Sequence, residues 1–110
     1  METRCFRIKL KPDSIGRVRE WARTINERRH EALETLRDET VVLESMFLDR
    51  TEQGDFLIGY MKAESFQKAG ATVQKSVHAI DEYHRKFKQD TWEERVELEL
   101  LIDLDRIWER

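Results

Sequence analysis

The residue best suited to chemistry in this sequence is a histidine that interrupts an apolar pattern. His84 occupies a helical position where the spacing calls for Leu or Val, so its imidazole is expected to point at the sheet. Imidazole titrates near neutrality, which suits a general base or a ligand contact. Two interpretations stay open. The ring is either a partly buried group satisfied by one hydrogen bond, or part of a pocket between helix and sheet.

Two charged residues are also unusual for their surroundings. Arg29 falls at the centre of the apolar stripe expected on the first helix, where an unpaired guanidinium would be very costly. It either extends past the helix end to water or binds an anionic ligand or a carboxylate such as Glu44. Glu44 interrupts an apolar strand. It either faces a barrel formed between subunits or is an edge charge that discourages aggregation.

The remaining candidates are weaker. Tyr60, Tyr83 and Trp92 suit a cavity wall as well as a core or an interface. The expected pocket residues are therefore His84, Arg29, Glu44, Tyr60, His30 and Trp92. No catalytic residue is assigned. No metal site is expected, because His78 and His84 point about 120° apart on one helix. No Gly-rich phosphate loop or CxxC pair is present, so we expect no cofactor.

Composition limits the function classes. The chain has 110 residues, which suits one domain over 1–110. Its 20 basic and 23 acidic residues give a net charge of −3, which disfavours nucleic acid as a partner. No apolar run approaches the roughly 20 residues of a membrane span. Cys5 is the only cysteine, and the N-terminus has no signal-peptide core. We therefore expect a cytoplasmic protein without membrane contact.

Alternation and helical periodicity predict the elements that position these residues. Strict period-2 alternation predicts a strand over 5–11, and a helix follows Pro12 with its apolar stripe reaching Leu36. Residues 41–48 and 56–62 predict a hairpin around a short turn. A second long helix is expected from near Glu64 to Phe87. The sequence Thr91–Glu94 then matches a capping box that would begin one helical turn. A last strand is expected over 98–104, by alternation.

The order β-α-β-β-α-β predicts a ferredoxin-like α+β fold. Its four-stranded antiparallel sheet would have the order 4-1-3-2, with two helices on one face. In this arrangement Arg7 and Lys9 would lie opposite Glu99 and Asp103. Apolar residues such as Met46 would remain on the other sheet face, depending on the phase of the strands. A face left uncovered by helices needs a partner, so we expect a homodimer formed through the sheet.

Several segments resemble a known family. They are Arg7–Pro12, Arg17–Trp21, His78–His84, Thr91–Arg95 and Leu101–Asp105. Together they resemble a family of short uncharacterised bacterial proteins in the dimeric α/β-barrel group. The resemblance implies the ferredoxin-like dimer and no particular activity. More remotely, the layout resembles sugar mutarotases and cofactor-free monooxygenases of the same architecture, at the level of the fold alone.

Two hypotheses for function follow. The first is a homodimeric small-molecule-binding domain, and a cofactor-independent enzyme is one form of it. Its pocket would lie between helices and sheet, with His84 and Arg29 as polar anchors. The alternative is a non-catalytic module in which dimerisation is itself the function. A cavity of roughly 300 Å³ or more reached by either anchor would favour the first.

Overall fold

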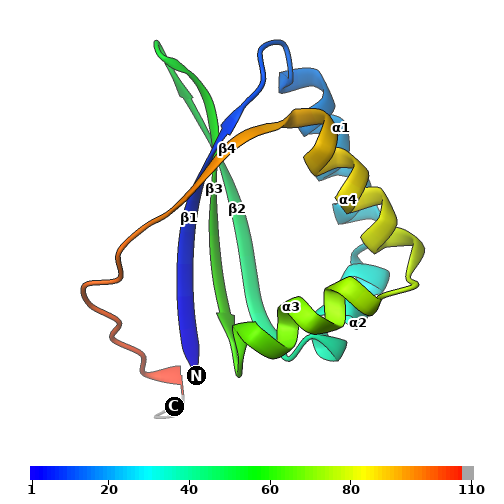
Figure 1. The fold of residues 1–110 in the computed structure, drawn as a ribbon, viewed down its shortest axis with the longest axis vertical. Helices are drawn as coiled ribbons and strands as arrows, with labels where there is room; N and C mark the ends of the chain where they lie inside the picture. The colour runs from blue at the N-terminus through cyan, green and yellow to red at the C-terminus, as the bar shows by residue number, and fades with distance from the viewer. Residues whose placement is uncertain (108–110) are drawn as a thin grey trace.

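The computed structural model describes residues 1–107 and contains one antiparallel sheet with all of its helices on one side (Figure 1). The strand order is β2-β3-β1-β4, which reads 4-1-3-2 from the opposite edge. This confirms the ferredoxin-like α+β fold expected from the pattern. The elements are β1 (Glu2–Leu10), α1 (Ile15–Glu27), α2 (Arg29–Asp38), β2 (Val41–Thr51), β3 (Gly54–Ala63), α3 (Phe66–Lys75), α4 (Ala79–Thr91) and β4 (Trp92–Glu97).

The core lies between the sheet and the helices α1 and α4. Period-2 alternation directs Phe6, Ile8 and Leu10 of β1 towards these helices, where all three are buried. Phe87 of α4 and Ile8 have no exposed surface at all. We call this helix-covered side the inner face of the sheet, and the opposite side the outer face.

Each of the two long helices expected from the sequence is interrupted. The first breaks at Arg28, between α1 and α2, and the second breaks over 76–78, between α3 and α4. At the second break the Ser76 side chain accepts a hydrogen bond from the backbone N–H of His78, a local bond that competes with the helix. As a result Val77, expected on the buried seam, is 97% exposed. None of the helices in residues 1–107 is long and apolar enough to cross a membrane.

The fourth strand comes earlier in the chain than expected. The capping box predicted at 91–94 is wrong, because Thr91 ends α4 and donates its hydroxyl to the Phe87 carbonyl oxygen, at 2.8 Å. The strand predicted over 98–104 is also wrong. The register that pairs Phe6 with Glu97 would bring residue 101 opposite the start of β1, so a strand over 98–104 would run past its partner. Beyond β4, one backbone bond continues the pairing, from Leu98 N–H to the Cys5 carbonyl.

Arg7 and Lys9 of β1 lie near acidic side chains, as expected, but these are not the residues that were predicted. Arg7 and Lys9 do not meet Glu99 and Asp103, because β4 is shifted. Lys9 instead lies 3.5 Å from Glu93, and Arg7 lies 3.9 Å from Asp49 of β2. These side chains are about half exposed, so each pair contributes at most about 1 kcal/mol.

Gly59 provides a test of how closely the inner face packs. A methyl group added there would overlap the Phe6 ring and approach the Met46 sulfur to 3.0 Å. We expect Gly59→Ala to lower the free energy of unfolding by about 1–3 kcal/mol. Gly70→Ala is the matched control, because it lies in α3 with open space around it and should stabilise the helix by about 1 kcal/mol. Urea denaturation of both variants measures the difference. Equal effects would contradict the packing described here.

Candidate functional site

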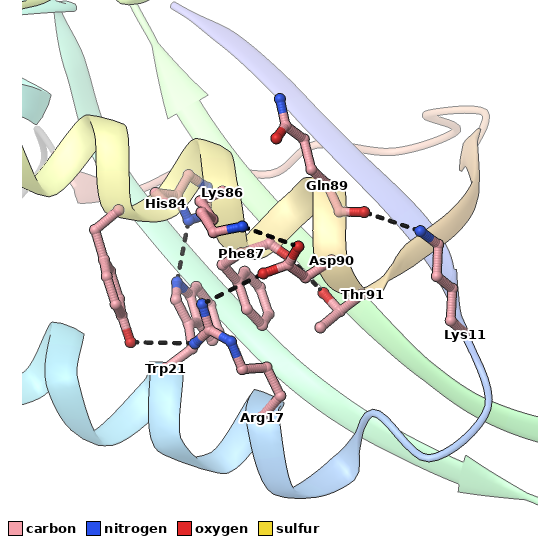
Figure 2. A network of polar contacts seen from close by, with 10 residues as sticks. Lys11, Arg17, Trp21, His84, Lys86, Phe87, Gln89, Asp90 and Thr91 are labelled. Atoms are coloured by element: carbon pink, nitrogen blue, oxygen red, sulfur yellow. Dashed lines mark hydrogen bonds and ion pairs between the residues drawn. The ribbon is translucent and has the colours of Figure 1, made fainter.

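His84 lies on the buried side of α4, where it forms a side-chain bond to α1. Its Nδ1 accepts a hydrogen bond from Nε1 of Trp21, at 3.1 Å (Figure 2). The two rings are stacked with centroids 5.6 Å apart, and Trp21 stacks in turn on Phe87 at 4.4 Å. Because an indole N–H can only donate, Nδ1 must carry a lone pair. The neutral ring therefore holds its proton on Nε2.

Burial keeps the His84 ring neutral. It lowers the pKa of His84 to about 4, because the charged ring would lose its hydration, and the nearby positive charge of Lys88 adds to the effect. Within residues 1–107, no hydrogen bond reaches Nε2 of this ring. At neutral pH His84 thus presents an N–H donor, not a cation.

Trp92 lies next to this ring as the first residue of β4. Its indole meets His84 edge-on, with centroids 6.5 Å apart, and the Lys88 ammonium lies 5.3 Å from its ring centre. The Trp92 Nε1 atom is buried and has no hydrogen-bond partner in the described chain, a property it shares with Thr40 Oγ1. A buried donor left unpaired costs about 1–3 kcal/mol. Such atoms are rare in folded proteins.

Glu44 and Lys88 are two charged groups of the inner face with shifted pKa values. Glu44 shares this face with Met46, as the register of β2 against β3 shows. Its pKa is raised, chiefly by burial, although the residue retains solvent contact. By surface area Glu44 is an exposed residue of the edge strand β2. Burial likewise lowers the pKa of Lys88, and the negative charge of Glu44 opposes this shift.

These four residues, His84, Trp92, Lys88 and Glu44, are called the inner-face site below. The sequence analysis did not single out Lys88. Its spacing of four residues from His84 was the available signal, because residues i and i+4 share one face of a helix.

The other three expected pocket residues lie elsewhere. Arg29 is exposed on α2, because the break at Arg28 removes it from the apolar stripe. His30 is also exposed, 3.9 Å from Glu34. Tyr60 lies on the outer face, where it lines a cavity of 450 Å³ with Leu43 and Lys62.

The shape of the site differs from the expectation. Neither the 450 Å³ cavity nor a second cavity, of 340 Å³, is lined by His84 or Arg29. The inner-face site is therefore defined by its unpaired donors and shifted charges, and not by a large hollow. In residues 1–107 no group of three or more His, Cys, Asp or Glu side chains is placed to hold a metal ion.

The lowered pKa of His84 predicts a pH effect on stability. The unfolded ring takes up a proton below about pH 6.5, whereas the folded ring resists it to about pH 4. Between these values, falling pH should reduce the free energy of unfolding by about 1.4 kcal/mol per pH unit through this group. Urea denaturation of His84→Gln should show a shallower slope than wild type in this interval. The exposed His30→Gln is the control and should keep the wild-type slope; equal slopes in all three would contradict a buried neutral ring.

Comparisons with known proteins agree with this architecture. L-rhamnose mutarotase from Formosa agariphila is similar in structure with a TM-score of 0.66 and 18% identity, covering 96% of this chain and 100% of that one. A putative antibiotic biosynthesis monooxygenase from Nitrosomonas europaea is similar with a TM-score of 0.56 and 15% identity. The match covers 89% of this chain and 94% of that one. Both show the dimeric α/β-barrel type of ferredoxin-like fold. No curated protein matches in sequence. A family model matches residues 1–109, so the chain belongs to the family of unknown function DUF6176.

Proposed function

We propose that this protein binds a small molecule at the inner-face site. The observation that carries the proposal is Trp92 Nε1, a buried donor without a hydrogen-bond partner in the described chain. It lies beside His84, whose Nδ1 is engaged and whose Nε2 forms no hydrogen bond within residues 1–107. A ligand oxygen that accepts both hydrogen bonds would remove the cost of the unpaired indole N–H. Lys88 would add a third donor, and Glu44 would supply an acceptor.

A compound rich in hydroxyl groups matches this combination. A hydroxyl both donates and accepts hydrogen bonds, so it can face the two neutral donors and the Glu44 carboxylate together. The flat face of Trp92 suits the apolar side of a small ring. The structural similarity to a rhamnose mutarotase supports testing monosaccharides first.

Cofactor-independent proton transfer is the reaction that the same groups would support. The pKa of Glu44 is raised and that of Lys88 is lowered, so both shift towards neutrality. Groups with pKa values near the working pH exchange protons with a bound hydroxyl most efficiently. Glu44 would serve as the base and Lys88 as the acid.

We also propose that two copies associate through the outer face. The segment after β4, residues 98–107, is called the C-terminal arm. Its apolar side chains are largely uncovered: Leu101 is 81% exposed and Leu104 is 90% exposed. Phe47 and Val96 add exposed apolar surface to this side of the sheet. Monomers rarely leave so many large apolar groups in water, and a second copy would cover them.

The arm is already fixed to its own sheet at one point. Lys62 on the outer face is 7% exposed and holds Asp103 at 3.1 Å and Asp105 at 3.0 Å. Thr3 donates a further hydrogen bond to Asp103, at 2.6 Å. Figure 1 shows the arm following the side of the sheet that the helices leave open. The partner copy would therefore meet a surface made of both sheet and arm.

The second candidate function is a dimerisation module without a ligand. It is favoured by the stacked packing of His84 on Trp21 and by cavities that His84 does not line. A cytoplasmic location is proposed for either function, since the single cysteine, Cys5, is free.

Binding at the inner-face site can be tested by NMR of the indole N–H groups. We expect a monosaccharide panel that includes L-rhamnose to shift the Trp92 signal, which Trp92→Phe would assign by its loss. The shift should vanish in His84→Ala and persist in His30→Ala, whose histidine is exposed on α2. Thermal stabilisation of wild type should follow the same pattern. A stabilising sugar that leaves the Trp92 signal unmoved, or acts equally on His84→Ala, would contradict the site, and a panel without effect would favour the module.

The dimer can be tested by light scattering after size-exclusion chromatography. We expect wild type to elute at twice the mass of the chain, and Leu101→Arg to elute as a monomer, because a charge would enter the apolar interface. Leu33→Arg is the matched control, since Leu33 is exposed on α2, away from the outer face. A monomeric wild type, or a Leu101→Arg variant that still dimerises, would contradict the proposal.

A further inference from the structure

A second cavity lies between three helices, outside the inner-face site. It measures 340 Å³ and is lined by the end of α2, the end of α3 and the start of α4 with the segment before it. Its polar residues include Asp38, Glu39, Thr72, Ser76, His78 and Asp81. We call it the Glu39 cavity. Its volume lies within the usual range for a small-ligand site.

Two of its acidic side chains are already engaged. Asp38 accepts a hydrogen bond from His78 Nε2 at 2.9 Å, and the Asp38 carboxylate raises the pKa of that histidine. Asp81 accepts a hydrogen bond from the hydroxyl of Ser76. Both carboxylates are thus fixed in place by neighbours of the same cavity wall.

Glu39 is different because its carboxylate has no partner. The residue is only 7% exposed, yet no hydrogen bond or ion pair to its side chain occurs within residues 1–107. Its oxygens are not among the fully buried atoms without partners, so they keep some accessible surface, and the residue lines the cavity. The cation on the cavity wall, Lys75, is exposed and makes no ion pair with it. A buried carboxylate of this kind is rarely left unpaired.

We propose that the Glu39 cavity binds a small organic cation, a primary ammonium group on a short carbon chain, with its nitrogen against the Glu39 carboxylate. An ammonium supplies three N–H donors, which Glu39 and the nearby hydroxyl of Thr72 can accept. The methyl groups of Thr35 and Thr72 on the wall suit a short carbon chain. A metal ion does not fit, because only one carboxylate is free and ions such as Ca²⁺ need several oxygen ligands.

The electrostatics of the cavity favour the same class of ligand. The pKa of Glu39 is raised to about 7, first by burial and then by the negative charges of Asp81, Glu44 and Asp38, while Lys88 opposes this shift. His78, beside Asp38, and Lys75, on α3, are the other charged groups of the wall. Near neutral pH the carboxyl is therefore partly protonated. A bound ammonium would stabilise the carboxylate and release this proton.

The test uses n-butylammonium chloride as the probe and ¹⁵N–¹H NMR of the full chain as the readout. We expect it to shift the backbone amides of 35–40 and 76–81, whereas 1-butanol, which has the same shape and no charge, should not. Glu39→Gln should weaken binding about tenfold or more, because the variant keeps the size of the side chain and loses its charge. Glu52→Gln is the matched control, an equal change in the exposed turn between β2 and β3, and should bind as wild type does.

The pH dependence gives a second, independent readout. Binding that requires ionised Glu39 should be about thirty-fold weaker at pH 5.5 than at pH 8. ¹³C NMR of the glutamate side chains should show one carboxyl titrating near pH 7, with a lower pKa when the probe is bound. Absence of amide shifts with n-butylammonium, equal affinity in Glu39→Gln, or equal response to 1-butanol would each overturn the proposal. The sugar panel tests the inner-face site separately, through the Trp92 signal.

Discussion

The junction between α4 and β4 determines most of what is distinctive in this structure. Thr91 is the last residue of the helix and Trp92 the first of the strand, with no loop between them. The carbonyl of Thr91 accepts the backbone N–H of Lys11 at 2.8 Å, just beyond the end of β1. This bond joins the start of β4 to the end of β1, and the pairing of the two strands shifts by one residue between Lys9 and Leu10. The same junction positions Trp92 beside His84.

The second constraint is the contact between α1 and α4 through Trp21 and His84. The hydrogen bond fixes which nitrogen of the imidazole carries the proton, and the stacked rings fix its plane. A histidine in this position accepts the Trp21 hydrogen bond through Nδ1 and still has the Nε2–H group as a donor. The two interpretations of His84 are therefore compatible. Nδ1 takes part in the packing of α1 on α4, and Nε2 is the donor of the proposed site.

The fold could be predicted from the sequence because the alternation of β1 and the hairpin signal between β2 and β3 are local properties of the chain. The spacing of Phe6, Ile8 and Leu10 alone predicts that they share one face of the strand. The fourth strand could not be located in the same way. Residues 98–104 alternate more regularly than 92–97, and only the pairing of β4 with β1 shows that the strand begins at Trp92. Local pattern predicts that a strand exists, while its register depends on tertiary contacts.

The candidate site was predicted in part for a similar reason. His84 and Glu44 were found because each departs from its local pattern, and Trp92 because an aromatic ring suits a cavity wall. Arg29 was misplaced because one continuous helix was assumed, and a single break at Arg28 turns it to solvent. Glu39 gave no signal, since a glutamate before a strand is unremarkable until the packing around it is known. Only the three-dimensional structure shows that the Glu39 side chain is buried without a hydrogen-bond or ion-pair partner in the described part of the chain.

The two aspartates held by Lys62 have a consequence for the movement of the arm. Asp103 and Asp105 are two positions apart, so both point to the same side of an extended chain and share one lysine. Sliding the arm by one residue would bring Leu104 to a buried ammonium. Sliding it by two would leave one aspartate facing Lys62 and carry the other away. Only the observed alignment of the arm on the sheet lets Lys62 contact both aspartates.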